Sequence, residues 1–113
     1  MNENKINILW TNADPVTSKL MVMMYATNAK KRKLWEHVRV IIWGATAKLV
    51  AEDCHIQSLL AEAKEAGVEF SACIACAERL GVKEKLQELD IDIRTWGIPL
   101  TEIIKQNEHL ITI

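Results

Sequence analysis

Five short runs of apolar and β-branched residues recur along the chain, and stretches with helical periodicity separate them. The run at 38–43 is nearly continuous in β-branched and aromatic residues, which is typical of a strand covered on both faces. Alternating strands and helices imply a mostly parallel sheet, with right-handed crossovers that place helices on both sides. The sequence therefore predicts a three-layer α/β/α fold with a mostly parallel five-stranded sheet. Its expected strands are 6–10, 38–43, 68–72, 91–96 and 110–113.

Local signals mark the helices between these runs. Asp14-Pro15 predicts a helix start, because Asp14 can cap and proline suits the first helical position. A second helical region is expected after Gly44, with an interruption at Asp53 and an end at Gly67. A third is broken at Gly81. The last connection runs from Gly97-Ile98-Pro99 to about Gln106, and Pro99 suits a first helical position.

Apolar side chains follow Asp14 at helical spacing, which predicts the buried stripe of the first helix. Three methionines belong to this segment, and we interpret them as core packing rather than metal ligands. The stripe consists of Val16, Leu20, Met23, Met24 and Thr27, with Met21 beside it.

Length and composition set the broad class. The 113 residues suit one domain, 1–113, with its own hydrophobic core. The net charge of -1 and scattered basic residues argue against a nucleic-acid partner. No apolar run approaches the length of about 20 residues that spans a bilayer, and Met1–Lys5 lead into the first strand without an apolar signal segment. We expect a cytoplasmic protein with no membrane partner.

Cys73 and Cys76 lie where the run at 68–72 passes into a helical pattern. The free N–H groups of a helix's first turn and the positive end of its dipole stabilise a thiolate over a thiol. A cysteine in this position is a candidate nucleophile. The chain has an odd number of cysteines, three, so we expect free thiols rather than a disulfide framework.

The Cys-x-x-Cys spacing alone also occurs in zinc sites, dithiol redox centres and sulfur carriers. A structural zinc site needs about four ligands, and the remaining candidates, Cys54 and His55, are separated from the pair by a helix and a strand. We interpret Cys54 as an interior cysteine and His55 as a surface histidine. The sequence predicts neither a metal nor a cofactor.

Ligands of an open parallel sheet bind outside the carboxyl ends of its strands. Three of the four tryptophans, Trp10, Trp43 and Trp96, close a strand at this edge, either as pocket walls or as plugs of the core. We predict a pocket here around the two cysteines. Its other candidate residues are Thr11, Asn12, Asp14, Trp43, Gly44, Thr46 and Gly97.

The segment 67–82, Gly-Val-Glu-Phe-Ser-Ala-Cys-Ile-Ala-Cys-Ala-Glu-Arg-Leu-Gly-Val, resembles the active-site region of the DsrE/DsrF-like family, the sulfur-relay proteins related to TusD. The likeness extends to Ile-Leu-Trp-Thr-Asn at 8–12, Ile-Ile-Trp-Gly at 41–44 and Gly-Ile-Pro-Leu-Thr at 97–101. The resemblance implies that Cys73 accepts sulfane sulfur as a persulfide. It also implies a trimeric or hexameric homo-oligomer, and sulfur donors and acceptors that are either proteins or small sulfur species.

Cys76 departs from the family pattern, because the relay subunits compared have a small apolar residue at this position. A second thiol can attack a persulfide on Cys73 and release sulfide, which describes a sulfane-sulfur reductase or sensor. The sequence therefore leaves three alternative functions open. They are a persulfide carrier that uses Cys73, a dithiol oxidoreductase that uses Cys73 and Cys76, and a binding module with buried, inert cysteines.

Overall fold

The computed structural model describes residues 4–113, so residues 1–3 of the predicted domain and of the N-terminal stretch lie outside the described residues. Within this range one sheet has the order β4-β3-β2-β1-β5, and every neighbouring pair is parallel. The predicted sheet is confirmed. Its strands are β1 (Lys5–Trp10), β2 (His37–Ile42), β3 (Glu69–Cys73), β4 (Asp92–Arg94) and β5 (His109–Thr112).

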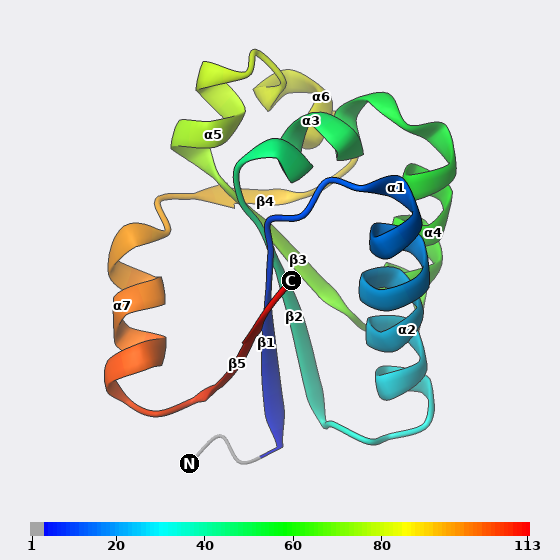
Figure 1. Ribbon diagram of the computed structural model, residues 1–113, viewed down its shortest axis with the longest axis vertical. Coiled ribbons are helices and arrows are strands. Elements are labelled where there is room, and N and C mark those ends of the chain that lie inside the picture. Colours follow the sequence, from blue (N-terminus) through cyan, green and yellow to red (C-terminus); the bar gives the residue numbers. More distant parts are fainter. Residues whose placement is uncertain (1–3) are drawn as a thin grey trace.

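The helices cover both faces of the sheet. The chain moves in one direction from β1 to β4 and then returns to the free edge of β1, so right-handed crossovers place the last helix on the opposite face from the earlier ones. Figure 1 shows α7 alone on one side of the sheet, with α1, α2 and α4 on the other. The predicted three layers are confirmed. The helices are α1 (Pro15–Thr17), α2 (Met24–Lys31), α3 (Ala45–Glu52), α4 (Cys54–Ala66), α5 (Ile74–Arg79), α6 (Lys83–Glu88) and α7 (Gly97–Lys105).

Most predicted helix boundaries are confirmed by their caps. The Asp14 carboxylate accepts the Thr17 N–H at 2.9 Å, and Asp53 separates α3 from α4 and caps the latter. Gly67, with a φ of 105°, ends α4, and the chain breaks between α5 and α6 around Gly81. The last helix, Gly97–Lys105, agrees with the predicted connection from Gly97 to about Gln106, but Pro99 is not at its first position. The proline occupies the third helical position, where its missing N–H is still without cost.

The first connection forms one helical segment, because a π-helical stretch η1 (Ser18–Met23) joins α1 to α2. Its predicted core stripe is confirmed at Met23, half-buried at Thr27 and wrong at the other three positions, and Met21 beside it is also exposed. Val16 is 63% exposed, Leu20 60% and Met24 50%. The face toward the sheet is built largely of smaller side chains, which let the helix backbone approach the strands closely. The buried residues are Ser18, Val22, Met23, Ala26 and Ala29.

Candidate functional site

Cys73 stands at the junction between β3 and α5. It is the last residue of the strand and also the N-cap of the helix, with extended backbone angles (φ −69°, ψ 121°). Its side chain is only 6% exposed and belongs to a cluster with Ile41, Trp96 and Ile103. Ile103 comes from α7, so the sulfur lies on the face of the sheet that this single helix covers. We call these four residues the Cys73 cluster.

Cys76 lies one helical turn after Cys73 and packs against the Cys73 cluster. Its Sγ accepts the backbone N–H of Gly44 at 3.2 Å, a contact between the loop after β2 and helix α5. Gly44 has a φ of +68°, a conformation that favours glycine. Burial raises the pKa of the Cys76 thiol, as does the neighbouring Cys73, and these effects outweigh the lowering by the Gly44 N–H and Arg79. Cys76 is therefore a thiol held in a defined orientation.

Trp96 is held in the Cys73 cluster by a chain of hydrogen bonds. Its indole N–H donates to Ser71 Oγ at 2.8 Å, and the Ser71 hydroxyl donates to Asp92 Oδ2 at 2.8 Å. Arg94 Nε donates to the same oxygen at 2.6 Å. Burial raises the pKa of the Asp92 carboxyl. The hydrogen bonds from Ser71 and Arg94 lower that pKa and together outweigh the effect of burial, so the net shift is downward. The ionised carboxylate thus anchors the bonds that orient the indole.

Two arginines flank the Trp96 ring. The guanidinium carbon of Arg39 lies 5.0 Å from the ring centroid and that of Arg94 lies 5.7 Å away, both within the range of cation–π attraction. The sequence reasoning missed Ser71 and Asp92. The available signal was the Ser71 hydroxyl between the apolar residues Phe70 and Ala72, since a buried polar group needs a partner.

The predicted pocket residues divide into two groups. Trp43 is half-buried and packs against the Cys73 cluster, and Gly44 contacts Cys76. Thr46 is fully buried, and its hydroxyl donates to the Trp10 carbonyl at 2.8 Å and accepts the Trp43 N–H at 3.1 Å. It therefore ties together the ends of β1 and β2. Gly97 is exposed and begins α7 directly after Trp96.

Thr11, Asn12 and Asp14 are exposed in the loop after β1. The Thr11 hydroxyl donates to the Ile113 carbonyl at 3.0 Å, next to the strand pair β1–β5. Asn12 Oδ1 accepts the Asp14 N–H at 2.9 Å, and Asp14 in turn caps α1. These bonds organise the loop and join it to the end of the chain.

Cys54 is exposed at the first position of α4, so its interpretation as an interior cysteine is wrong. The helix presents this position to solvent because the buried stripe of α4 starts two residues later, at Ile56. His55 is exposed, as predicted. Within residues 4–113, no three His, Cys, Asp or Glu side chains gather in a way that would hold a metal ion. Over the same range, no helix combines the length and the apolar character needed to cross a bilayer.

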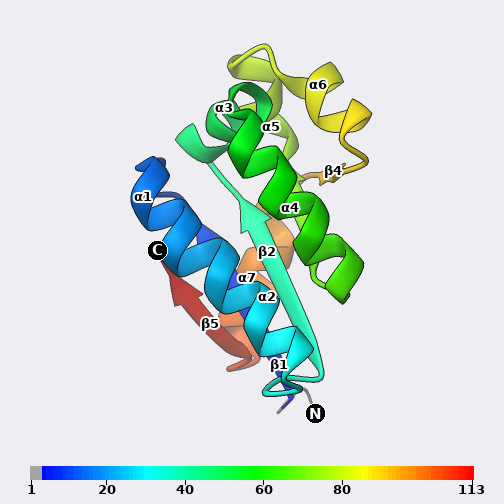
Figure 2. The same cartoon turned by 90° about the vertical axis from the view of Figure 1, so that its right-hand side faces the viewer.

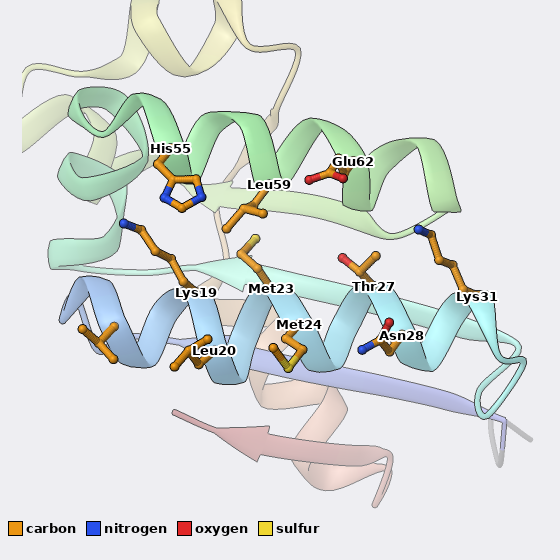
Figure 3. Close-up of a pocket in the computed structure, with 11 residues that line it drawn as sticks. Lys19, Leu20, Met23, Met24, Thr27, Asn28, Lys31, His55, Leu59 and Glu62 are labelled. Atoms are coloured by element: carbon orange, nitrogen blue, oxygen red, sulfur yellow. The ribbon is translucent and has the colours of Figure 1, made fainter.

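An open cavity of about 550 Å³ lies between the α1–η1–α2 segment and α4, two elements that run side by side in Figure 2. Figure 3 shows Met23 and Leu59 directed toward each other between the two elements, with Lys19, His55 and Glu62 around them, and Met24 also lines the cavity. Its lining includes the stripe of the first helix that the sequence assigned to the core, namely Val16, Leu20, Met23, Met24 and Thr27. None of its lining residues belongs to the Cys73 cluster, so it is a separate surface feature.

Solved structures share this architecture. A conserved protein of unknown function from Bacteroides thetaiotaomicron is 41% identical, with a TM-score of 0.95 over 97% of this chain and 95% of that one. The ychN protein from E. coli is 16% identical, with a TM-score of 0.72 over 97% of this chain and 99% of that one. A protein of unknown function from Methanobacterium thermoautotrophicum is also 16% identical, with a TM-score of 0.72 over 98% and 100%. The last two likenesses concern the fold alone.

Sequence comparison assigns the chain more specifically. No curated protein matches it at a significant level. The profile of the DsrE/DsrF-like family, however, matches residues 5–113, which include the described strands and helices and both Cys73 and Cys76. The chain therefore belongs to the DsrE/DsrF-like family.

Proposed function

We propose that the protein transfers sulfur by carrying sulfane sulfur as a persulfide on Cys73. Membership in a family of the sulfur-relay type supports the general class. The observation that carries the assignment to Cys73 is its place as the N-cap of α5, without a side-chain hydrogen bond to the cap and within a buried apolar cluster. Its side chain is shielded from bulk water at the start of a helix.

The loading step is a thiol exchange. The Cys73 thiolate attacks the outer sulfur of a donor persulfide, R–S–SH, and R–SH leaves with the donor's proton, so that Cys73 ends as Cys73–S–S⁻. The free N–H groups of the first turn of α5 favour the anion, and the apolar cluster limits contact with oxidants. Trp43, Gly44, Thr46 and Gly97, together with Thr11, Asn12 and Asp14 of the loop after β1, complete the proposed pocket.

The proposal extends to setting and partners. The proposed sulfur donors and acceptors are other proteins or small sulfur species, each of which exchanges sulfur with the Cys73 thiol in a transient encounter. The family resemblance implies a homo-oligomer, a trimer or a hexamer, and we propose a cytoplasmic setting.

Intact mass measurement tests the acceptor. A Cys76→Ser variant, in which no second thiol can consume the persulfide, is reduced and incubated with glutathione persulfide without oxygen. We expect a mass gain of one sulfur atom, which dithiothreitol removes. The same gain in a Cys73→Ser/Cys76→Ser variant would contradict the proposal, and so would its absence in Cys76→Ser.

The exposed Cys54 offers a matched control, because it also begins a helix. Cys54→Ser/Cys76→Ser should load as fully as Cys76→Ser. The dithiol oxidoreductase alternative predicts that Cys76→Ser acquires no stable extra sulfur. The binding-module alternative predicts that none of the variants reacts.

A further inference from the structure

We propose that Cys76 discharges the persulfide on Cys73, which makes the protein a sulfane-sulfur reductase that releases hydrosulfide and is left with a Cys73–Cys76 disulfide. This inference rests on the proposed function, since Cys73 must first carry the persulfide. It adds to that function a resolving residue and a product.

The first argument is the spacing of the two cysteines on α5. Residues three apart at a helix start lie on one face, with Cβ atoms about 5–6 Å apart. A disulfide needs Cβ atoms about 3.5–4.5 Å apart, so a small adjustment at the helix start brings the pair within bonding distance. Cys76 also packs directly against the Cys73 cluster. The two sulfurs therefore occupy one site.

The second argument is independent of α5 and comes from the loop after β2. The Gly44 N–H donates to Cys76 Sγ at 3.2 Å, so a backbone group from a neighbouring strand end orients this sulfur. The same N–H stabilises negative charge as Cys76 becomes a thiolate. A cysteine that only filled space would not need this donor, which the positive φ of Gly44 helps to place.

Access favours an internal thiol over an external one. Cys73 is 6% exposed, whereas Cys76 is partly exposed beside it. An external thiol must open the Cys73 cluster to reach the persulfide, but Cys76 already lies there. Well-oriented intramolecular reactions gain large effective concentrations of the attacking group.

The discharge step balances without a further oxidant. Cys76 Sγ attacks Cys73 Sγ, the bond from Cys73 Sγ to the outer sulfur breaks, and the new Sγ–Sγ bond forms. The outer sulfur leaves with the bonding electron pair and takes up the Cys76 thiol proton as HS⁻. It gains two electrons, and the two cysteines lose two. A dithiol reductant then returns the disulfide to two thiols.

The protonation of Cys76 is consistent with this sequence of events. Burial raises the pKa of Cys76 above the ordinary value of 9.0, so the thiol retains near neutral pH the proton that the departing sulfur needs. The Gly44 N–H then supports the thiolate as the proton leaves.

The experiment compares reduced wild type with Cys76→Ser, each given one equivalent of glutathione persulfide without oxygen. Wild type should end two hydrogens lighter, with one hydrosulfide released per chain and a Cys73–Cys76 disulfide in its peptide map. Cys76→Ser should hold its extra sulfur at least about 100-fold longer. Cys54→Ser should behave as wild type, and Cys73→Ser should form no disulfide between these positions.

The outcomes separate the two proposals. If wild type keeps the extra sulfur as long as Cys76→Ser does, Cys76 is not a resolving residue, and the persulfide carrier stands. If Cys76→Ser gains no sulfur at all, the proposed function fails and the discharge step fails with it.

Discussion

Two helix starts in this protein carry a cysteine, and they differ in what else the helix end binds. At α4, the Asp53 carboxylate accepts the N–H groups of His55 and Ile56 at 2.9 and 3.0 Å, and Cys54 is exposed to solvent. At α5, Cys73 is itself the cap, without a side-chain hydrogen bond, and is buried. A helix end already occupied by a carboxylate offers little to a thiolate, whereas an open one does. The comparison shows that capping and burial, not the helix start alone, distinguish the two thiols.

Removing the indole that covers Cys73 should have the largest effect. Trp96 is 1% exposed, and Trp96→Ala should lower the free energy of unfolding by about 3–5 kcal/mol, because it leaves a large cavity and removes the donor to the Ser71 hydroxyl. Urea unfolding measures the loss. The half-buried Trp35, which bonds to Tyr25, provides the matched control, and Trp35→Ala should cost less. Equal losses would contradict the role given to Trp96.

The next largest effect should come from removing the Thr46 hydroxyl, which joins the ends of β1 and β2 beside the site. Thr46→Val removes a fully buried hydroxyl and with it one of the two donors to the Trp10 carbonyl, the other being the Trp43 N–H at 3.2 Å, which should cost about 1–3 kcal/mol in urea unfolding. Thr101→Val is the control, since the exposed Thr101 hydroxyl bonds only within its own helix. If both changes have the same effect, Thr46 does not join β1 to β2 as described.

Thiol labelling compares the two cysteines directly. In variants that retain a single cysteine, a bulky maleimide should label Cys54 at least about tenfold faster than Cys73, because Cys73 reacts only when its cluster opens. The difference should vanish in denaturing urea. Similar rates in the native protein would mean that Cys73 is not shielded.

The smallest effect concerns the cap at α4. The hydrogen bond from the Ile56 N–H lowers the pKa of Asp53 below its ordinary value of 3.8, although burial opposes it. The stability that this carboxylate contributes is therefore present above pH 3.8 and is lost as the pH falls through the lower folded pKa. Asp53→Asn removes that dependence, so the stability difference from wild type should shrink as acid is added. Acid titration by circular dichroism checks this, and a constant difference would contradict it.

Much of the fold could be predicted because its signals are local. Asp14, Asp53 and Gly67 act on groups within a few residues, and each marks the predicted boundary. Cys73 could be placed at the end of a strand for the same reason. The face of the first helix was predicted wrongly, because two overlapping stripes compete there and the larger side chains are on the exposed one. Only packing against the sheet selects between them.

The alternation of strands and helices, the helix caps and the position of Cys73 at a strand end follow from local sequence, because periodicity and capping depend on neighbouring residues. Which distant groups meet depends on the fold. Gly44 and Cys76 are 32 residues apart, Ser71 and Trp96 are 25 apart, and β5 returns to lie beside β1. These contacts arise from the order of strands in the sheet, which no local pattern contains. The sequence thus shows only that Cys76 follows Cys73 by three residues, whereas the fold shows that the Gly44 N–H orients its thiol.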